Sequence, residues 1–168
     1  MGTPSGRPSG GGLLRAGIVG AGFAGLHLAR LLDGSGLDCL LLDKGRSPGG
    51  RAATRRIGDA RVDHGLPWLT AGGDLSRHLI DEFRGDGLVE PLDAGGSAGV
   101  AWASPAGLSS LMKHLASARD IRLSSRVLSV SPEGDAVRLE IEYGEGPRQE
   151  LTARHVVITA PVPQMIEM

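Results

Sequence analysis

The chain has 168 residues, a formal net charge of -1 at pH 7, 27 glycines and one cysteine. This length suffices for roughly one domain with its own hydrophobic core. The near-neutral charge excludes an electrostatic footprint for nucleic acid or an anionic membrane, and the single cysteine, Cys39, excludes an internal disulfide.

Residues 1–12 are mostly glycine, serine and proline. Such a composition buries too little apolar surface to order itself, so we expect a disordered tail. The tail lacks the apolar core of a secretory signal, and no segment has the ~20 apolar residues of a membrane span. We therefore expect a cytoplasmic protein in which residues 13–168 form one ordered domain.

Residues 13–43 predict a strand, a helix and a second strand, the opening unit of a dinucleotide-binding fold. A GxGxxG run follows the first strand and consists of Gly20, Ala21, Gly22, Phe23, Ala24 and Gly25. In this pattern the first glycine permits a tight turn, the second lets backbone approach a pyrophosphate, and the third lets the helix pack closely on the strand. The start of the helix offers free N–H groups and a positive dipole end to the phosphates.

An acid stands where the second strand ends. Asp43 follows the apolar residues 39–42 and lies 23 positions after Gly20, a distance typical of an acid that accepts hydrogen bonds from the ribose hydroxyls. A GxGxxG run alone is equally typical of an ordinary glycine-rich turn, but the strand, helix and acid together favour a dinucleotide site. Within the second strand we expect Cys39 to be a buried, inert thiol.

A second glycine-rich loop follows Asp43 and Lys44. Gly49 and Gly50 let backbone approach a ligand without a Cβ in the way, and the Arg51 guanidinium next to them can neutralise a diphosphate with paired hydrogen bonds. We interpret the loop as a second phosphate clamp, although a solvated loop has the same composition.

Residues 52–63 predict two short strands around a turn at Gly58-Asp59. In the segment that follows, Gly65 could let backbone pass against a flat ring, and Trp68 could wall the same site. His64 has no nucleophile or carboxylate placed to work with it, so we favour a histidine satisfied by local hydrogen bonds over a proton-transfer group. The sequence contains no CxxC or HExxH spacing, and we predict no metal site.

Two amphipathic helices and a set of strands complete the chain. Asp74 is the predicted N-cap of a helix that buries Leu75, Leu79, Ile80 and Phe83 and ends at Gly85 or Gly87. Residues 88–104 are expected to be irregular apart from the apolar residues 100–103. Ser104-Pro105 predicts the start of a helix whose core positions are Leu108, Leu111, Met112 and Leu115.

The strands predicted after these helices are residues 121–123, 126–131, 137–143, 149–153 and 155–159. The third alternates apolar and charged residues and should have one wet face. The last is apolar without alternation, so we expect it to be covered on both faces and to join the parallel sheet of the first strand. Residues 161–168 begin a helix without a closing turn, and we expect the chain to be a fragment. The predicted fold class is α/β, a Rossmann-like domain with a parallel central sheet and a β-meander.

The order of these motifs resembles the FAD-binding part of the flavin-dependent amine oxidase superfamily, and within it the renalase-like enzymes. The more specific features are Asp43-Lys44, residues 104–114 and residues 159–164. The resemblance implies that FAD is the cofactor and that it is bound by Gly20, Ala21, Gly22, Phe23, Ala24, Gly25, Asp43, Lys44, Gly49, Gly50, Arg51, Gly65, Leu66, Val127, Thr159 and Ala160. Gly65 and Leu66 would line the isoalloxazine, Val127 would meet the adenine, and Thr159 and Ala160 would lie near the dinucleotide.

Renalase-like enzymes oxidise a small substrate such as dihydronicotinamide isomers with oxygen as the acceptor, so the implied partner is a small, NAD(P)H-like molecule. The catalytic residues cannot be named, because the flavin itself accepts the hydride. Three alternatives remain. They are an amine oxidase or desaturase relative, a non-catalytic nucleotide-binding remnant or piece that needs a partner chain, and an NAD domain. The clamp at residues 49–51 and the meander argue against the last.

Overall fold

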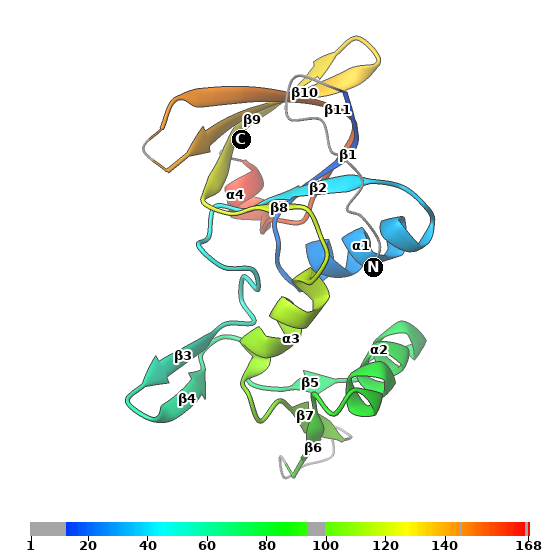
Figure 1. Ribbon diagram of the computed structural model, residues 1–168, viewed down its shortest axis with the longest axis vertical. Helices are drawn as coiled ribbons and strands as arrows, with labels where there is room; N and C mark the ends of the chain where they lie inside the picture. The colour runs from blue at the N-terminus through cyan, green and yellow to red at the C-terminus, as the bar shows by residue number, and fades with distance from the viewer. Residues whose placement is uncertain (1–12, 94–99, 145, 167) are drawn as a thin grey trace, which may run out of the picture.

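The computed structural model describes residues 13–93, 100–144, 146–166 and 168; the tail expected at residues 1–12 lies outside them. Within the described residues the chain forms three sheets (Figure 1). The large sheet has the order β8 (Ile121–Arg122), β2 (Cys39–Leu42), β1 (Leu14–Val19), β11 (Arg148–Ile158), β10 (Ala136–Tyr143) and β9 (Ser125–Glu133). None of the described helices has the length and apolar character to cross a membrane. The predicted α/β class with a parallel-containing central sheet is confirmed.

Strand β11 joins the parallel and antiparallel halves of this sheet. Ala153 pairs with Leu14 of β1 on one side and with Val137 of β10 on the other. The predicted parallel pairing with the first strand is therefore confirmed, but the prediction of two separate strands at 149–153 and 155–159 is wrong. Polar residues at positions 154 and 155 interrupt the apolar pattern, yet they leave the main-chain hydrogen bonds of the ladder intact.

The end of β11 is not covered on both faces, contrary to the expectation. Val157 is the partner of Ile18 in β1 and is 40% exposed, whereas Ile18 is fully buried. Directly paired residues of a parallel sheet lie on the same face. Helix α1 (Phe23–Gly34) therefore covers β1 but does not extend over β11.

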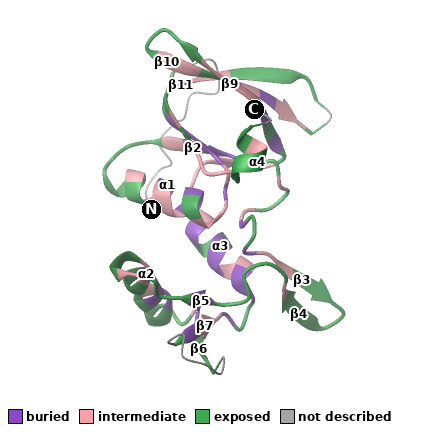
Figure 2. Ribbon diagram, turned by 180° about the vertical axis from the view of Figure 1, so that it is seen from behind, coloured by how far each residue is buried: buried purple, intermediate pink, exposed green. Residues whose placement is uncertain are grey.

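Helices α1 and α3 (Leu108–Ala116) pack on one face of the large sheet (Figure 1). The predicted apolar stripe of α3 is confirmed as core, because all four of its residues are at most 2% exposed. Cys39 packs against this core and is half-buried rather than buried. Figure 2 shows that α3 is the most consistently buried of the helices, as expected for an element at the centre of the core.

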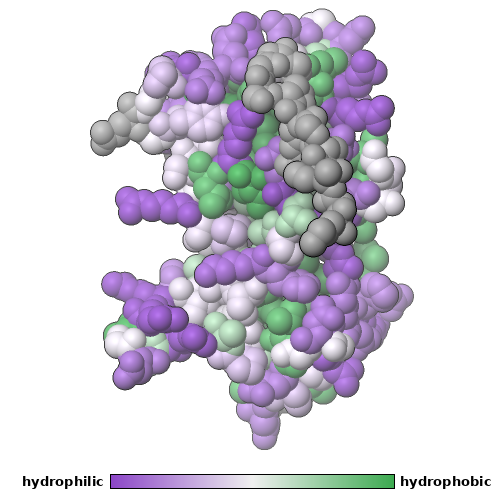
Figure 3. Space-filling model, viewed as in Figure 1, coloured by the Kyte–Doolittle hydropathy of each residue, from purple (hydrophilic) through white to green (hydrophobic). Residues whose placement is uncertain are grey.

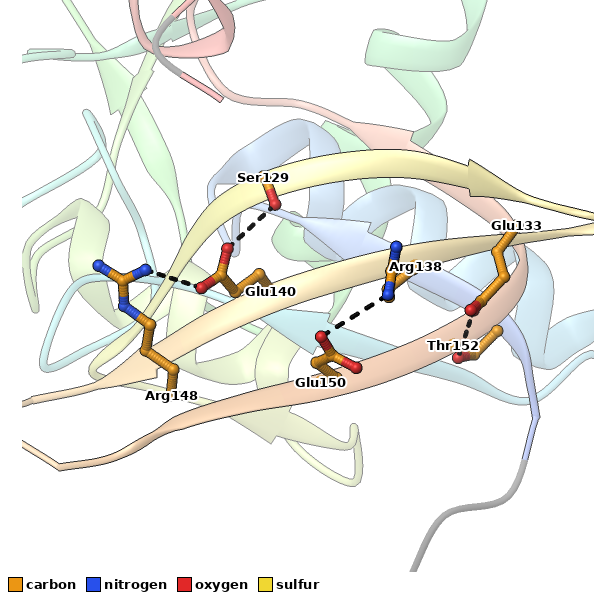
Figure 4. Close-up of polar contacts among 7 residues, drawn as sticks. All are labelled: Ser129, Glu133, Arg138, Glu140, Arg148, Glu150 and Thr152. Carbon is orange, nitrogen blue, oxygen red and sulfur yellow. Dashed lines mark hydrogen bonds and ion pairs between the residues drawn. The ribbon is translucent and has the colours of Figure 1, made fainter.

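Strands β9 and β10 curl over the opposite face of the sheet and enclose a second apolar cluster. The predicted one-sided wet face of β10 is confirmed, since Leu139 and Ile141 are fully buried while Arg138 and Glu140 turn outward. The outer face carries cross-strand polar pairs (Figure 4), namely Ser129–Glu140 at 3.4 Å, Arg148–Glu140 at 2.8 Å, Arg138–Glu150 at 3.8 Å and Thr152–Glu133 at 3.4 Å. Such exposed pairs each contribute little to stability.

A smaller antiparallel sheet lies beside α2 (Asp74–Gly85) at the lower end of Figure 1. Its strands are β5 (Leu69–Thr70), β7 (Ala101–Ala103) and β6 (Glu90–Leu92), in that order. The expectation that residues 88–104 are irregular apart from one apolar piece is therefore wrong for β6, which pairs with β7. Residues 94–99 lie outside the described part of the chain.

Helix α2 begins one residue away from its predicted cap. Gly73 is the N-cap, and its amide donates to the Ser76 hydroxyl at 3.0 Å. Asp74 is the first helical residue, where its charge favours the positive end of the helix dipole. Leu75, predicted to be core, is 78% exposed, whereas Leu79, Ile80 and Phe83 are buried as expected.

The start of α3 also differs from the prediction. Residues 104–107 form a turn, in which the Gly107 amide donates to the Ser104 carbonyl at 2.8 Å, and Gly107 is the N-cap. The predicted hairpin at residues 52–63 is confirmed as β3 (Thr54–Ile57) and β4 (Ala60–Asp63). This hairpin, not Ser104, supplies the oxygen atoms that cap α3. After β11 the chain forms one short helical turn, α4 (Val162–Met165).

Candidate functional site

The glycine-rich turn connects the end of β1 to α1, and its glycines differ in the room that they leave for a side chain. Gly20 has φ +109°, and a Cβ there would lie 2.7 Å from the Thr159 hydroxyl. A Cβ on Gly25 would overlap the Gly20 carbonyl. A Cβ on Gly22, in contrast, would meet nothing within 4 Å. Gly20 and Gly25 are therefore required by protein packing, whereas the space at Gly22 is open to a ligand.

The N-terminus of α1 has no cap from its own residues. Gly22 is the N-cap and has no side chain to accept the first amides, and the first turn contains no acid. The amides of Phe23 and Ala24 belong to this turn, and both residues line a cleft. Unsatisfied amides at a positive helix end are suited to bind an anion.

Asp43 ties the second strand to the turn. Its Oδ2 accepts a hydrogen bond from the Ala21 amide at 2.6 Å, and its Oδ1 accepts one from the Gly45 amide at 2.7 Å. A carboxylate has about four acceptor positions, so these two bonds fix its orientation and leave capacity for two ribose hydroxyls. The geometry is compatible with the predicted ribose contact.

The loop at residues 49–51 lies directly on the glycine-rich turn. The Gly49 amide donates to the Ala21 carbonyl at 2.8 Å, and Gly22 and Gly49 form a parallel bridge. Gly50 has φ +54°, and its Cβ would lie 3.4 Å from the Cα of Gly22. Arg51 is exposed and lines the cleft. The two loops predicted to bind phosphate are therefore adjacent.

Gly65 lines the cleft and also makes a close contact within the protein. A Cβ on Gly65 would overlap the Arg51 carbonyl, and the Leu66 amide donates to that same carbonyl at 3.0 Å. The glycine is therefore required by the Arg51 backbone. Trp68 lines a separate hollow of about 190 Å³ and not the main cleft, contrary to the expectation, and His64 is exposed.

Thr159 closes the turn from the other side. Its amide donates to the Val19 carbonyl at 2.9 Å, and its hydroxyl lies 3.1 Å from the Val19 carbonyl and 3.2 Å from the Gly20 carbonyl. One hydroxyl proton is shared between these two acceptors. The side chain therefore links the end of β11 to the first residue of the glycine-rich turn.

These segments surround one cleft of about 1090 Å³. Figure 3 shows a recess at the left edge of the molecule, between the part that contains the large sheet and the β3–β4 hairpin. All the sequence-predicted cofactor residues line the cleft except Ala21, Gly25 and Gly49, which lie beneath its surface. The cleft is as large as the largest ordinary ligand sites.

Comparisons with known proteins agree with this geometry. Residues 18–83 match the family model described as NAD(P)-binding Rossmann-like domain, and residues 85–166 match the one described as flavin containing amine oxidoreductase. The matches show a similarity to the flavin amine oxidase superfamily, and neither of them spans half of the chain. The renalase-like assignment within it is a finer statement that these matches do not make.

Individual relatives share only parts of their length with this chain. Hydroxyneurosporene desaturase from Rubrivivax gelatinosus is 38% identical over 37% of this chain and 14% of that protein. A proposed protoporphyrinogen oxidase from Exiguobacterium sp. 255-15 is 16% identical with a TM-score of 0.70, over 92% of this chain and 61% of that chain. The p-nitrophenol 4-monooxygenase of Pseudomonas putida DLL-E4 is 17% identical with a TM-score of 0.60, over 92% of this chain and 42% of that chain. The two structural likenesses show the fold.

FAD is the cofactor that the superfamily matches support, and the cleft fits it. The space at Gly22, the uncapped start of α1 and the oriented Asp43 carboxylate form a cradle that a Cβ at Gly22 would partly fill. The binding roles of the individual residues remain predictions from the sequence.

Several cleft residues escaped the sequence analysis. Gly45, Arg46 and Ser47 follow Lys44 directly, and Gln164 follows Thr159 closely; all four line the cleft. Ser109 and Lys113 come from α3. The apolar pattern of that helix predicted only its buried face. The available signal was that both lie outside the stripe and one helical turn apart.

The cleft is strongly cationic. Among the residues that the structure describes, its ionisable lining residues are one acid, Asp43, and the cations Lys44, Arg46, Arg51, Lys113 and Arg126. The whole chain carries only -1, so positive charge is concentrated here. A cleft lined by one sign of charge attracts ligands of the opposite sign.

A polar cluster away from the cleft joins the three long helices. The Arg30 guanidinium of α1 contacts Glu82 of α2 at 2.6 Å, and His114 of α3 lies 3.5 Å from Asp86. The donor atoms of Glu82, Asp86 and His114 lie within 4.8 Å of one another. Because Arg30 already engages Glu82, we interpret the cluster as an ion-pair network and not as a metal site.

His27 of α1 lies next to this network. Burial lowers the pKa of His27 below its ordinary value, Arg30 lowers it further, and Glu82 opposes the shift. Its Nδ1 is buried and has no hydrogen-bond partner among the described residues. The neutral imidazole is therefore the favoured form in the folded chain.

Proposed function

We propose that the chain is the FAD-binding part of an FAD-dependent oxidoreductase that oxidises a small molecule by hydride transfer. The observation that carries the proposal is the single cleft in which the open Gly22, the Asp43 carboxylate and Arg51 meet. In this cleft the amides at the start of α1 and the Arg51 guanidinium would hold the diphosphate, and Asp43 would hold the adenosine ribose.

The residues of the chain would position the cofactor and set the polarity around it. When bound, FAD supplies the hydride-accepting ring. The backbone of Gly65 and the side chain of Leu66 would lie beside that ring and exclude water from its edge. The proposal includes no nucleic-acid or membrane partner and retains the expected cytoplasmic location.

Two substrate classes fit this proposal. The resemblance of residues 104–114 and 159–164 to renalase-like enzymes favours dihydronicotinamide isomers, with oxygen as the acceptor. The amine oxidase or desaturase alternative is supported equally well by the flavin containing amine oxidoreductase match and by the desaturase relative. A nucleotide-binding chain without turnover of its own is the third possibility.

A binding experiment tests the proposal directly. The purified chain is titrated with FAD by calorimetry, and Asp43→Ala is compared with Asp38→Ala, an exposed acid outside the cleft. Loss of hydrogen bonds to a charged group costs about 1.5–3 kcal/mol, so FAD affinity should fall roughly 10-fold to 100-fold in Asp43→Ala. Absence of FAD binding by the unmodified chain would refute the proposed function.

The substrate class is tested on FAD-loaded protein without oxygen. The loss of flavin absorbance is followed after addition of dihydronicotinamide isomers, of a primary amine, or of a carotenoid precursor. Bleaching by the first alone supports the renalase-like class, and bleaching by the second or third supports the alternative. If none bleaches the flavin, the chain binds FAD without oxidising these substrates.

A further inference from the structure

Helix α3 presents two polar side chains to the cleft that the motifs and family matches leave without a role. Ser109 and Lys113 stand at positions i and i+4, so they share one face of the helix, and both line the cleft. The buried stripe of α3 occupies the other face. The ligand-facing side of α3 is therefore polar and positively charged.

Packing places this face close to the predicted phosphate-binding loops. A Cβ on Gly49 would lie 3.2 Å from the Met112 side chain, so α3 packs directly on the loop at residues 49–51. That loop in turn donates from Gly49 to the Ala21 carbonyl. Lys113 directly follows Met112, and both Lys113 and Arg51 line the cleft.

The N-terminus of α3 is not available to a ligand. The Leu108 amide donates to the Asp63 carboxylate at 3.0 Å, and the Ser109 amide donates to the Thr54 hydroxyl at 3.0 Å. A ligand bound at α3 must therefore be held by the side chains of Ser109 and Lys113, not by the helix end.

Neither side chain has a partner within the described part of the chain. Among residues 13–93, 100–144, 146–166 and 168, no carboxylate pairs with the Lys113 ammonium and no group bonds to the Ser109 hydroxyl. Four of the cleft's cations, Lys44, Arg46, Arg51 and Lys113, exceed the about two negative charges of a diphosphate even after Asp43 neutralises one of them. The cleft therefore has positive charge to spare for a second anionic group.

We propose that Ser109 and Lys113 form an oxyanion subsite that takes a phosphate or carboxylate group. This inference rests on the proposed function, because the anion is either the FAD diphosphate or an acidic group of a substrate bound beside FAD. The hydroxyl and the ammonium both donate hydrogen bonds to oxygen, and the ammonium is a compact charge suited to an oxyanion.

The first experiment separates these two sources. Lys113→Met and Ser109→Ala are titrated with FAD and with riboflavin, which lacks phosphate, by the change in flavin fluorescence. Arg56→Met is the matched control, because it removes one positive charge from the exposed face of β3 outside the cleft. If the anion is the diphosphate, Lys113→Met lowers FAD affinity roughly 10-fold or more and leaves riboflavin affinity unchanged.

The second experiment uses the scarcity of lysine in this chain. Lys44 and Lys113 are the only lysines in the sequence, so acetylation by acetic anhydride can be followed at each one by mass spectrometry of peptides. If the subsite takes a substrate group, inorganic phosphate slows acetylation of Lys113 in FAD-loaded protein by at least several-fold at constant ionic strength. FAD affinity is then unchanged in Lys113→Met, and an added lysine-containing peptide reports general reactivity, because Lys44 lines the same cleft.

The inference is overturned if Lys113→Met binds FAD as tightly as Arg56→Met does and phosphate leaves Lys113 acetylation unchanged. This outcome differs from failure of the proposed function, in which the unmodified chain does not bind FAD. In that case the acetylation experiment without FAD still decides the subsite, because protection by inorganic phosphate needs only Ser109 and Lys113.

Discussion

The carboxylate of Asp63, at the end of β4, accepts a hydrogen bond from the amide of Leu108, the first residue of α3, at 3.0 Å. The same carboxylate oxygen accepts the hydroxyl proton of Thr54. The Asp63-His64-Gly65 segment therefore has a structural role, because Asp63 caps α3 and the absence of a side chain at Gly65 lets the chain pass Arg51. These contacts connect the β3–β4 hairpin to α3, the helix that carries Ser109 and Lys113.

We predict that Asp63→Ala destabilises the chain through the lost cap. Loss of an N-cap acceptor costs about 0.5–2 kcal/mol, and the buried amide left behind places the expected loss in the upper half of that range. The measurement is the free energy of unfolding in urea. Asp59→Ala, in the exposed turn of the same hairpin, should leave that free energy unchanged. Equal stability of the two variants would show that Asp63 does not cap α3.

Thr159 should be needed for its hydroxyl group. Thr159→Val keeps the shape of the side chain but removes the donor to the Val19 and Gly20 carbonyls, so we expect a loss of about 1 kcal/mol in stability and several-fold weaker FAD binding. Thr159→Ser should restore both. Thr152→Val, on the outer face of β11, the strand that ends just before Thr159, is the control. Wild-type FAD affinity in Thr159→Val would contradict a role for the hydroxyl in holding the turn.

The lowered pKa of His27 predicts that the folded chain loses stability in acid. Because its pKa in the folded chain lies below the ordinary value of 6.5, only the unfolded chain takes up the proton just below that pH, and the free energy of unfolding falls as the pH falls. Above the ordinary value both states are neutral and His27 has no effect. His27→Gln should therefore show a flatter decrease between about pH 7.5 and about pH 5.5. Parallel curves for the two proteins would show that His27 does not contribute.

Local patterns predicted much of this fold. The strand, helix and acid around Gly20 and Asp43, the alternation in β10 and the apolar stripe of α3 are each determined by neighbouring residues, and they are confirmed. The predicted helix boundaries were wrong where a residue far away in the sequence determines them. Gly107 replaces Ser104 as the cap of α3 because Asp63 and Thr54 approach it from another strand, and no local pattern records that contact.

The sequence predicted the loops of the site but not the residues that α3 contributes to the cleft. Glycine spacing marks a close approach of backbone, and this signal identified the loops at residues 20–25 and 49–51. Ser109 and Lys113 reach the cleft only because α3 packs on Gly49, which is a tertiary contact between residues far apart in sequence. The exposure of Val157 likewise depends on a tertiary contact, because it is determined by how far α1 extends over the sheet.

The most direct test of the central claim is the calorimetric affinity of Gly22→Leu for FAD. A side chain at Gly22 enters open space, so the fold should persist while FAD affinity falls by roughly 100-fold or more as the phosphate position is filled. Gly73→Leu is the matched control, because Gly73 is also an N-cap glycine with open space around it but lies outside the cleft. FAD affinity in Gly22→Leu equal to that of Gly73→Leu would contradict the binding of a dinucleotide at the start of α1.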